Sequence, residues 1–250
     1  MDTSSFQRVA VLGTGLIGGS CALAARVALG TGAKIVGWDR PEVLDRARAK
    51  GAIDEGRTDL GQALGGADLI YVALPVGLTI EKLPEIARYA APSALVTDSA
   101  STKRLVCEAA AKSFAAGALF LGGHPMAGQE HSGIDVASAD LFRDAKYALI
   151  GEASSDRAAG APQDARVEKF LGVVAAIGAR PLWLDAGTHD RAAAAVSHLP
   201  QLLAVALAGV VQEQTDETGL PMMLAGRGLR DMLRLAGNVN NYVPLLQRAF

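Results

Sequence analysis

Short apolar runs alternate along the first three quarters of the chain with longer stretches that repeat apolar residues at helical spacing. The apolar runs predict strands and the longer stretches predict helices. We expect strands at 8–12, 34–38, 52–54, 68–74, 94–97, 118–121, 146–150 and 180–184, and helices at 16–29, 41–50, 59–64, 78–90, 104–113 and 167–177. Because strands that alternate with helices form parallel sheets covered on both faces, we predict an α/β fold, a doubly wound parallel sheet.

The pattern changes near residue 186. Apolar helical patterns then run from 189 to about 214 and from 222 to the end of the chain, with no further strand pattern. We therefore expect two domains, an α/β domain at 1–186 and an all-helical domain at 187–250. A helical segment this short can hardly bury its apolar faces alone, so it must pack on the first domain, on a partner subunit, or on both.

A glycine-rich turn, residues 13–18, joins the first predicted strand to the first predicted helix. Gly13 permits a tight turn, Gly15 lets a pyrophosphate approach the backbone, and Gly18 lets the helix pack close to its strand. Together with the free N–H groups of the helix N-terminus, this context predicts a Rossmann-type dinucleotide-binding domain. We expect the cofactor to contact the turn and the neighbouring strand ends at Gly13, Thr14, Gly15, Leu16, Ile17, Gly18, Asp39, Arg40 and Pro75.

The residues that follow the second predicted strand bear on the choice of cofactor. Asp39 lies 26 residues after Gly13, near the spacing at which an acid binds the ribose hydroxyls of NAD. A carboxylate there repels a 2′-phosphate, so we expect NAD in preference to NADP. Arg40 leaves NADP open, because its guanidinium can pair with a 2′-phosphate or simply lie on the adenine face.

Composition and charge exclude several classes of function. The formal net charge of −2 gives no indication of a nucleic acid or an anionic membrane as partner. Cys21 and Cys107 lie in separate apolar helical patterns, so we expect buried reduced thiols, and no cluster has metal-ligand spacing. The N-terminus lacks a signal-peptide pattern, and the longest apolar run, 202–211, is far below the roughly 18 residues that predict a membrane span. We expect a soluble, cytoplasmic protein.

Three motifs follow predicted strands, where ligands of doubly wound sheets bind, and we expect them to face one crevice. They are the glycine turn, the segment Asp98–Lys103 and the loop that contains His124. His124, flanked by glycine and proline, is suited to accept a proton from a substrate hydroxyl near neutral pH. For Ser101 two alternatives stand equal, a helix N-cap and a hydroxyl that points into the crevice. For Lys103 we expect a solvated side chain.

The helical segment carries candidates of its own. His198 lies early in an apolar helical pattern, where a core histidine is the ordinary alternative to a ligand-binding one. Arg227, Arg230 and Arg234 lie along one side of a predicted helix, and an arginine there suits a substrate carboxylate, although at least one of them is expected to be solvated. We assign His131 and His189 to structure.

Taken together, these motifs resemble the prephenate/arogenate (cyclohexadienyl) dehydrogenase family of tyrosine biosynthesis. The resemblance covers nearly the whole chain. It rests on Gly-Thr-Gly-Leu-Ile-Gly-Gly-Ser at 13–20, the set Asp98, Ser101 and Lys103, Gly-Gly-His-Pro-Met-Ala-Gly-Gln-Glu at 122–130, Ser-His-Leu-Pro at 197–200 and Arg-Asp-Met-Leu-Arg-Leu-Ala at 230–236. The glycine turn alone is shared with many dehydrogenases, whereas the His124 motif together with Ser-His-Leu-Pro is specific.

The resemblance implies oxidative decarboxylation of arogenate or prephenate by NAD⁺, in a homodimer formed by the helical domain. The residue matching His124 would accept the hydrogen bond of the ring 4-hydroxyl as hydride leaves C4, and the residue matching Ser101 would bond that hydroxyl and orient the histidine. The residue matching Arg234 would bind a substrate carboxylate, with His198 nearby. Gln201 stands near the substrate side chain, at a position where many members have histidine.

Two further departures from the family pattern are Leu233, where many members have threonine, and Asn241-Tyr242, where many have Met-Trp. Two other functions stay open. One is a different NAD(P)-dependent dehydrogenase on the same scaffold, of the β-hydroxyacid or imine type, which would leave Ser101 and His124 unexplained. The other is a non-catalytic NAD-sensing protein.

Overall fold

The computed structural model describes residues 6–30, 32–115, 117–129, 131–151, 163–215, 219 and 223–237. These residues form two compact units. One contains the chain up to Gly128 together with Ser132–Asp190, and the other contains Gln129–His131 and the chain from Arg191 onward. The expected boundary after residue 186 lies at the start of helix α7 (Ala186–Ala193), whereas the units divide between Asp190 and Arg191, inside that helix.

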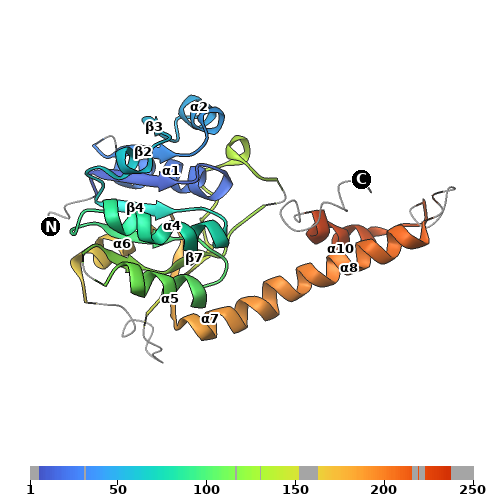
Figure 1. Ribbon diagram of the computed structural model, residues 1–250. Helices are drawn as coiled ribbons and strands as arrows, with labels where there is room; N and C mark the ends of the chain where they lie inside the picture. The colour runs from blue at the N-terminus through green and yellow to red at the C-terminus, as the bar shows by residue number, and fades with distance from the viewer. Residues whose placement is uncertain are drawn as a thin grey trace. The chain divides into compact units, whose positions relative to one another are not determined.

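The first unit is built on a six-stranded sheet in which every strand is parallel to its neighbours (Figure 1). The order is β3-β2-β1-β4-β5-β6. The strands are β1 (Arg8–Leu12), β2 (Lys34–Trp38), β3 (Glu55–Arg57), β4 (Leu69–Val72), β5 (Leu95–Asp98) and β6 (Leu119–Leu121). This arrangement confirms the predicted doubly wound sheet.

The third strand lies three residues later than expected. Residues 52–54 form a connection, and β3 is Glu55–Arg57. The apolar pair that suggested a strand, Ala52 and Ile53, is buried in the core, while the Asp54 carboxylate accepts the Ile35 N–H at 2.7 Å and so occupies a donor of β2. Burial of a connecting segment therefore produced an apolar pattern like that of a strand.

Alternate residues of the strands enter opposite layers of the core. In β1, Val9 and Val11 belong to one apolar cluster and Ala10 and Leu12 to the other. The first cluster includes residues of α1 (Leu16–Leu29), α2 (Pro41–Ala49) and α6 (Ala165–Ala176), and the second includes α3 (Leu60–Leu64) and α4 (Val76–Tyr89), on which α5 (Arg104–Ser113) packs. The sheet is thus covered on both faces, as its continuously apolar strands require.

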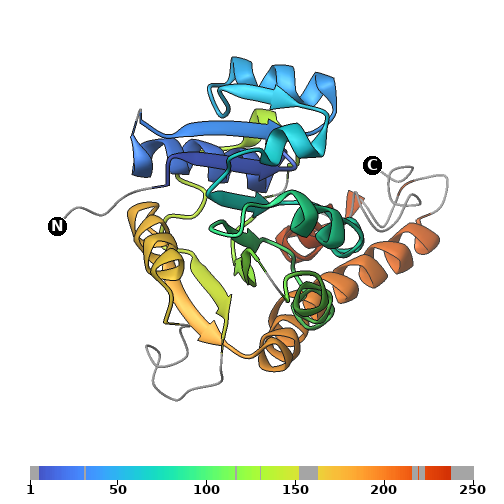
Figure 2. The same cartoon turned by 60° about the vertical axis from the view of Figure 1, so that its left-hand side comes forward.

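A second, three-stranded sheet was not predicted. It contains β7 (Gly123–Pro125), β8 (Lys146–Ile150) and β9 (Arg180–Leu184) in that order, with β7 antiparallel to β8 (Figure 2). The expectation of a loop around His124 is therefore wrong, because His124 pairs with Ala148 in a short strand. Glycine makes this path possible, since a Cβ on Gly123 would lie 2.7 Å from the carbonyl oxygen of Asp98.

The second unit is helical. Helix α7 continues through a π-helical segment, η2 (Ala194–His198), into α8 (Leu199–Gln214), and α10 (Arg227–Gly237) packs on α8 through the small residues Ala204, Ala208 and Ala236. The helix expected at 189–214 is confirmed. Of the second expected helix, from 222, Met223 is helical, residues 224–226 are not, and α10 begins at Arg227; 238–250 lie outside the described residues.

The continuous helix Ala186–Gln214 is exposed over most of its apolar length. Only 11% of its most apolar 18-residue window is buried, and by length and composition alone this helix is able to cross a membrane. The short apolar run noted in the sequence understated this length, because alanines extend the apolar surface beyond 202–211. A single such helix is weak evidence of membrane insertion.

Candidate functional site

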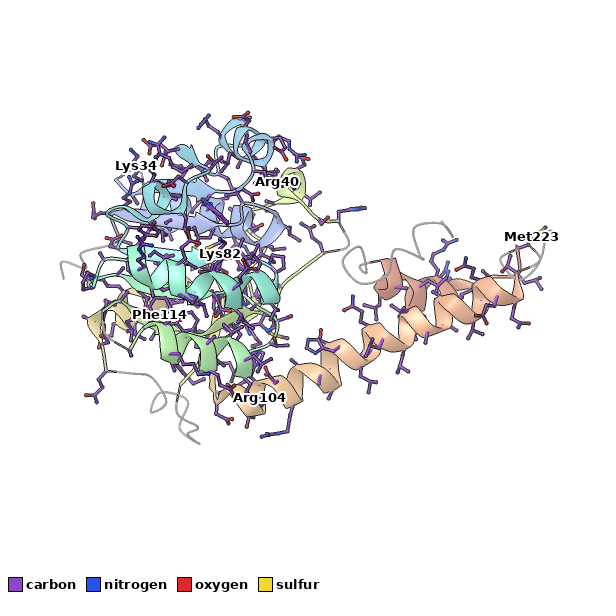
Figure 3. The ribbon with its side chains drawn as sticks, viewed as in Figure 1. Lys34, Arg40, Lys82, Arg104, Phe114 and Met223 are labelled. Carbon is purple, nitrogen blue, oxygen red and sulfur yellow. The ribbon has the colours of Figure 1, made fainter. Side chains whose placement is uncertain are left out.

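The predicted cofactor and catalytic residues of the first unit follow strands at one edge of the main sheet. Because the strands are parallel, the glycine turn after β1, Asp39 after β2, Pro75 after β4 and Asp98 at the end of β5 share the carboxyl edge. Figure 3 marks the direction, since Lys34 begins β2 and Arg40 follows its end. The strand order reverses between β1 and β4, which is where such sheets bind dinucleotides.

The glycine turn has the geometry that its spacing predicts. Gly13 has φ +85°, and a Cβ there would lie 2.4 Å from the Ala73 carbonyl oxygen. A Cβ on Gly18 would lie 1.8 Å from the carbonyl oxygen of Gly13, whereas a Cβ on Gly15 would meet nothing within 4 Å. Gly13 and Gly18 therefore serve the fold, and Gly15 leaves space for a ligand at an N-terminus of α1 that no N-cap side chain covers.

Asp39, which follows β2, is hydrogen-bonded to the glycine turn. Its Oδ2 accepts the Thr14 backbone N–H at 2.7 Å and the Thr14 hydroxyl at 3.2 Å, and its Oδ1 accepts the Arg40 N–H at 2.8 Å. Arg40 is exposed, with its guanidinium 3.5 Å from Glu42. The other predicted cofactor contacts are partly accessible. Leu16 and Ile17, in the first turn of α1, are half-buried, and Pro75, which precedes α4, is exposed.

A buried ion pair lies next to the candidate base. The side chains of Asp98 and Lys103 are both fully buried and paired, so the expectation of a solvated Lys103 is wrong. Asp98 Oδ1 accepts the Gly123 N–H at 3.0 Å, and Lys103 Nζ donates to the Gly123 carbonyl at 2.7 Å. The pair therefore holds both peptide groups of the residue that precedes His124, and Lys103 is inside because Asp98 and this carbonyl need a donor there.

His124 is half-buried and hydrogen-bonded to a second histidine. Its Nδ1 lies 3.0 Å from His189 Nε2, and His189 Nδ1 lies 2.8 Å from Asp190 Oδ1. His189 is 2% exposed, as suits a structural histidine, but its partner is the candidate base. Sequence reasoning missed both His189 and Asp190, because 65 residues separate His189 from His124.

The N-terminus of α5 is capped from a distant part of the chain. The Asp190 carboxylate accepts the N–H groups of Lys103 at 2.6 Å and Arg104 at 3.0 Å; Arg104, labelled in Figure 3, is the first residue of α5. The N-cap alternative for Ser101 is therefore wrong. Ser101 precedes the helix by three residues and is exposed, which agrees with the alternative of an accessible hydroxyl.

The second unit holds the predicted substrate-binding residues. His198 ends the π-helical segment and Gln201 lies in the first turn of α8; both are half-buried and, three residues apart, lie on the same side of the helix. Arg234 lies on α10, and its side chain is outside the described part of the chain. Arg227 and Arg230 on the same helix are exposed, as is His131.

Among the described residues, neither the two cysteines nor the His, Asp and Glu side chains form a metal site. Cys21 is buried and Cys107 half-buried, and both are free. Burial raises the pKa of Cys21 to about 12 and that of Cys107 to about 11, so both thiols are protonated at neutral pH. Within the described ranges, no group of three or more His, Cys, Asp or Glu side chains is placed to hold a metal ion.

Comparison with known proteins matches both halves of the chain to one family. Residues 22–182 match the family model for the prephenate dehydrogenase nucleotide-binding domain, and residues 185–243 match that for the prephenate dehydrogenase dimerization domain. The chain is 34% identical over 232 residues to a prephenate dehydrogenase of Lactococcus lactis subsp. cremoris, which covers 92% of this chain. It spans only 61% of that relative's length.

Two solved structures resemble the whole chain. A prephenate dehydrogenase from A. aeolicus, in complex with hydroxyphenyl propionate and NAD⁺, superposes with a TM-score of 0.76 at 28% identity, covering 98% of this chain and 82% of that one. A Synechocystis arogenate dehydrogenase superposes with a TM-score of 0.72 at 29% identity, covering 97% and 82%. Both match the α/β unit and the helical unit in one alignment.

Proposed function

We propose, because this chain belongs to the prephenate dehydrogenase family, that it catalyses the NAD⁺-dependent oxidative decarboxylation of a cyclohexadienyl acid in tyrosine biosynthesis. The substrate is arogenate, prephenate or both, and the product is tyrosine or 4-hydroxyphenylpyruvate. The observation that carries the proposal is the placement of His124, beside the carboxyl edge of the dinucleotide-binding sheet and held by buried polar partners. Since the product ring is aromatic, the reaction needs alignment and a proton acceptor rather than an electron-sink cofactor.

The residues present fit a dinucleotide. The open space at Gly15 and the N-terminus of α1 suit a pyrophosphate, and the Asp39 carboxylate suits an unphosphorylated ribose. Arg40, the residue that favoured NADP, lies beside Glu42, which weakens its attraction for a 2′-phosphate and supports NAD. When bound, NAD⁺ accepts the hydride that leaves ring C4.

The chain's own residues handle the proton and the substrate's position. His124 accepts the proton of the ring 4-hydroxyl as the ring carbonyl forms, and returns it to that oxygen when loss of CO₂ leaves a phenol. Ser101 donates or accepts a hydrogen bond at the same hydroxyl. In the helical unit, Arg234 binds a substrate carboxylate as a bidentate donor, and His198 and Gln201 contact the substrate.

The helical unit is the proposed homodimer interface, and the protein is proposed to be soluble and cytoplasmic. Large apolar side chains on α8 are exposed, including Leu202 at 66%, Leu203 at 55% and Val210 at 56%. A second copy that covers them accounts for this exposure without a membrane. Light scattering after gel filtration without detergent should give the mass of two chains, and a protein that stays in solution only with detergent would contradict this.

The activity is tested by steady-state rates with arogenate and prephenate, each against NAD⁺ and NADP⁺. We expect turnover with at least one substrate and a preference for NAD⁺. His124→Asn should keep its affinity for NAD⁺ and lose roughly 10²–10⁴-fold in turnover, the usual contribution of general acid–base catalysis. Cofactor binding without turnover in the unaltered protein would instead favour the NAD-sensing alternative, and turnover of a β-hydroxyacid or imine would favour the other dehydrogenase class.

A further inference from the structure

A chain of three polar side chains leads from the candidate base into the first unit. His124 Nδ1 lies 3.0 Å from His189 Nε2, and His189 Nδ1 lies 2.8 Å from Asp190 Oδ1. The two imidazole rings meet edge to face, with centroids 5.2 Å apart and planes at 68°. His189 is almost fully buried, and the Asp190 side chain is 27% exposed. The arrangement places a carboxylate behind the base, with one histidine between them.

The direction of each hydrogen bond follows from the charge of Asp190. Burial raises the pKa of this carboxyl, but the Arg104 and Lys103 amides and the His189 imidazole together lower it below its ordinary value. Asp190 is therefore ionised at neutral pH and only accepts hydrogen bonds. Neutral His189 must then carry its proton on Nδ1 and accept at Nε2, so the bond from His124 is donated by Nδ1–H.

We propose that His189 and Asp190 are positioning residues that hold neutral His124 in the Nδ1–H tautomer, so that its Nε2 is the atom that accepts the substrate proton. The proposal rests on the function proposed above. When His124 gains the proton, its positive charge lies next to a histidine that already points its acceptor at it and, beyond that, a carboxylate. Neither His189 nor Asp190 exchanges a proton with the substrate. Both act through His124, so neither is a catalytic residue.

The same carboxylate also ties the base to the serine segment. Asp190 accepts the N–H groups of Lys103 and Arg104, the residues that follow Ser101 and Thr102. Other titratable groups near His124, His189 and Asp190 are the paired Asp98 and Lys103 and the protonated Cys107. The charges of Lys103 and Asp190 both affect the pKa of the Cys107 thiol. Asp190 therefore fixes the backbone after Ser101 while it orients His124 through His189.

Asp190→Asn is the informative variant. Asp190 Oδ1 accepts from both His189 Nδ1 and the Lys103 amide, and Oδ2 accepts from the Arg104 amide. An asparagine whose oxygen takes the place of Oδ2 keeps the Arg104 bond and sets its NH₂ group in the place of Oδ1, where it donates to His189 Nδ1 and no longer accepts from Lys103. His189 then carries its proton on Nε2 and donates to His124, which forces His124 into the Nε2–H tautomer that cannot accept a proton there. The analogous change in the Ser-His-Asp triad lowers turnover by about 10⁴-fold through the wrong tautomer, and we expect a loss of roughly 10²-fold or more here.

The tautomer is read by ¹⁵N NMR of the imidazoles in the 250-residue chain, whose four histidines are few enough to assign by substitution. We expect Nδ1–H for His124 in the unaltered protein, Nε2–H in Asp190→Asn, and no preference in His189→Asn. The matched control is Asp59→Asn, because Asp59 also accepts a helix N–H, that of Gln62 at 2.8 Å, and asparagine caps equally well. It should change neither tautomer nor turnover.

The outcomes separate this proposal from the proposed function. A proton on His124 Nε2 in the unaltered protein, or an unchanged tautomer in Asp190→Asn, would overturn the proposal even if the enzyme is active. A low turnover in Asp190→Asn with an unchanged tautomer would assign Asp190 a structural role only, and also overturns it. The expected tautomers in a protein that turns over no cyclohexadienyl substrate would support the pairing and reject the function.

Discussion

Replacing Lys103 by methionine should destabilise the first unit strongly. The Lys103 ammonium and the Asp98 carboxylate are both fully buried, and removing the ammonium leaves the carboxylate with no cation and, among the described residues, with the amides of Ala100 and Gly123 as its hydrogen-bond donors. Breaking a buried pair from one side costs about 3–5 kcal/mol. For a domain of this size, that loss lowers the midpoint of thermal unfolding by roughly 6–20 °C.

The measurement is equilibrium denaturation at pH 7 with a matched control and a double-mutant cycle. Lys112 lies on α5, the helix that follows Lys103, with an exposed side chain, and Lys112→Met should change the free energy of unfolding by less than about 0.5 kcal/mol. Adding Asp98→Asn to Lys103→Met removes the unpaired charge, so the double variant should be more stable than the sum of the single losses predicts. A loss in Lys103→Met no larger than that in Lys112→Met would refute the reasoning.

Three further predictions concern the cofactor site, a helix cap and specificity. Gly18→Ala should lower both NAD⁺ affinity and thermal stability, because its Cβ would lie 1.8 Å from a backbone oxygen. The control Gly172→Ala should stabilise α6 by about 0.5–1 kcal/mol, because a Cβ there would meet nothing within 4 Å. Equal shifts of the melting temperature in the two variants would contradict this. The hydrogen bond from Arg166 lowers the pKa of the Asp164 carboxyl, so its stabilisation is complete above about pH 4 and is lost as pH falls through its folded pKa. Asp164→Ala should therefore cost about 1 kcal/mol at pH 7 and progressively less below pH 4, measured by urea unfolding. Gln201→His should shift the ratio of kcat/KM roughly tenfold toward the keto acid prephenate, because a protonated imidazole repels the ammonium group of arogenate; an unchanged ratio would remove Gln201 from the substrate site.

The main sheet was predictable because its signals are local. Each strand is a short apolar run and each helix repeats apolar residues at helical spacing, so neither depends on distant parts of the chain. The second sheet was not predictable in this way, because β7 is three residues long and contains glycine and proline. Its pairing with β8 depends on residues more than twenty positions away, and the sequence around His124 therefore has the composition of a loop.

The candidate site also contains residues that local sequence predicts and residues whose placement depends on distant parts of the chain. The sequence predicts the glycine turn, Asp39 and His124 as site residues because their neighbours in sequence define their context. The burial of Lys103 was missed, because a lysine before a helix is ordinarily solvated and its reason for burial is the carbonyl of Gly123. The role of Asp190 was missed for the same reason, since it caps a helix that begins 86 residues earlier.

Lys103 and Asp190 have different effects on His124, because the charge of Lys103 is neutralised by its partner Asp98, whereas Asp190 has no such ionic partner among the described residues. Lys103 bonds to the residue before His124, and alone its charge would oppose protonation of the base. Asp98 cancels that charge, so the pair contributes rigidity and little net field. Among the described residues, Asp190 accepts hydrogen bonds from the Lys103 and Arg104 amides and from His189 and has no lysine or arginine side chain paired with it, so under the proposal its negative charge is what stabilises a protonated His124. Loss of Lys103 should therefore appear first in the free energy of unfolding, and loss of the Asp190 charge first in turnover.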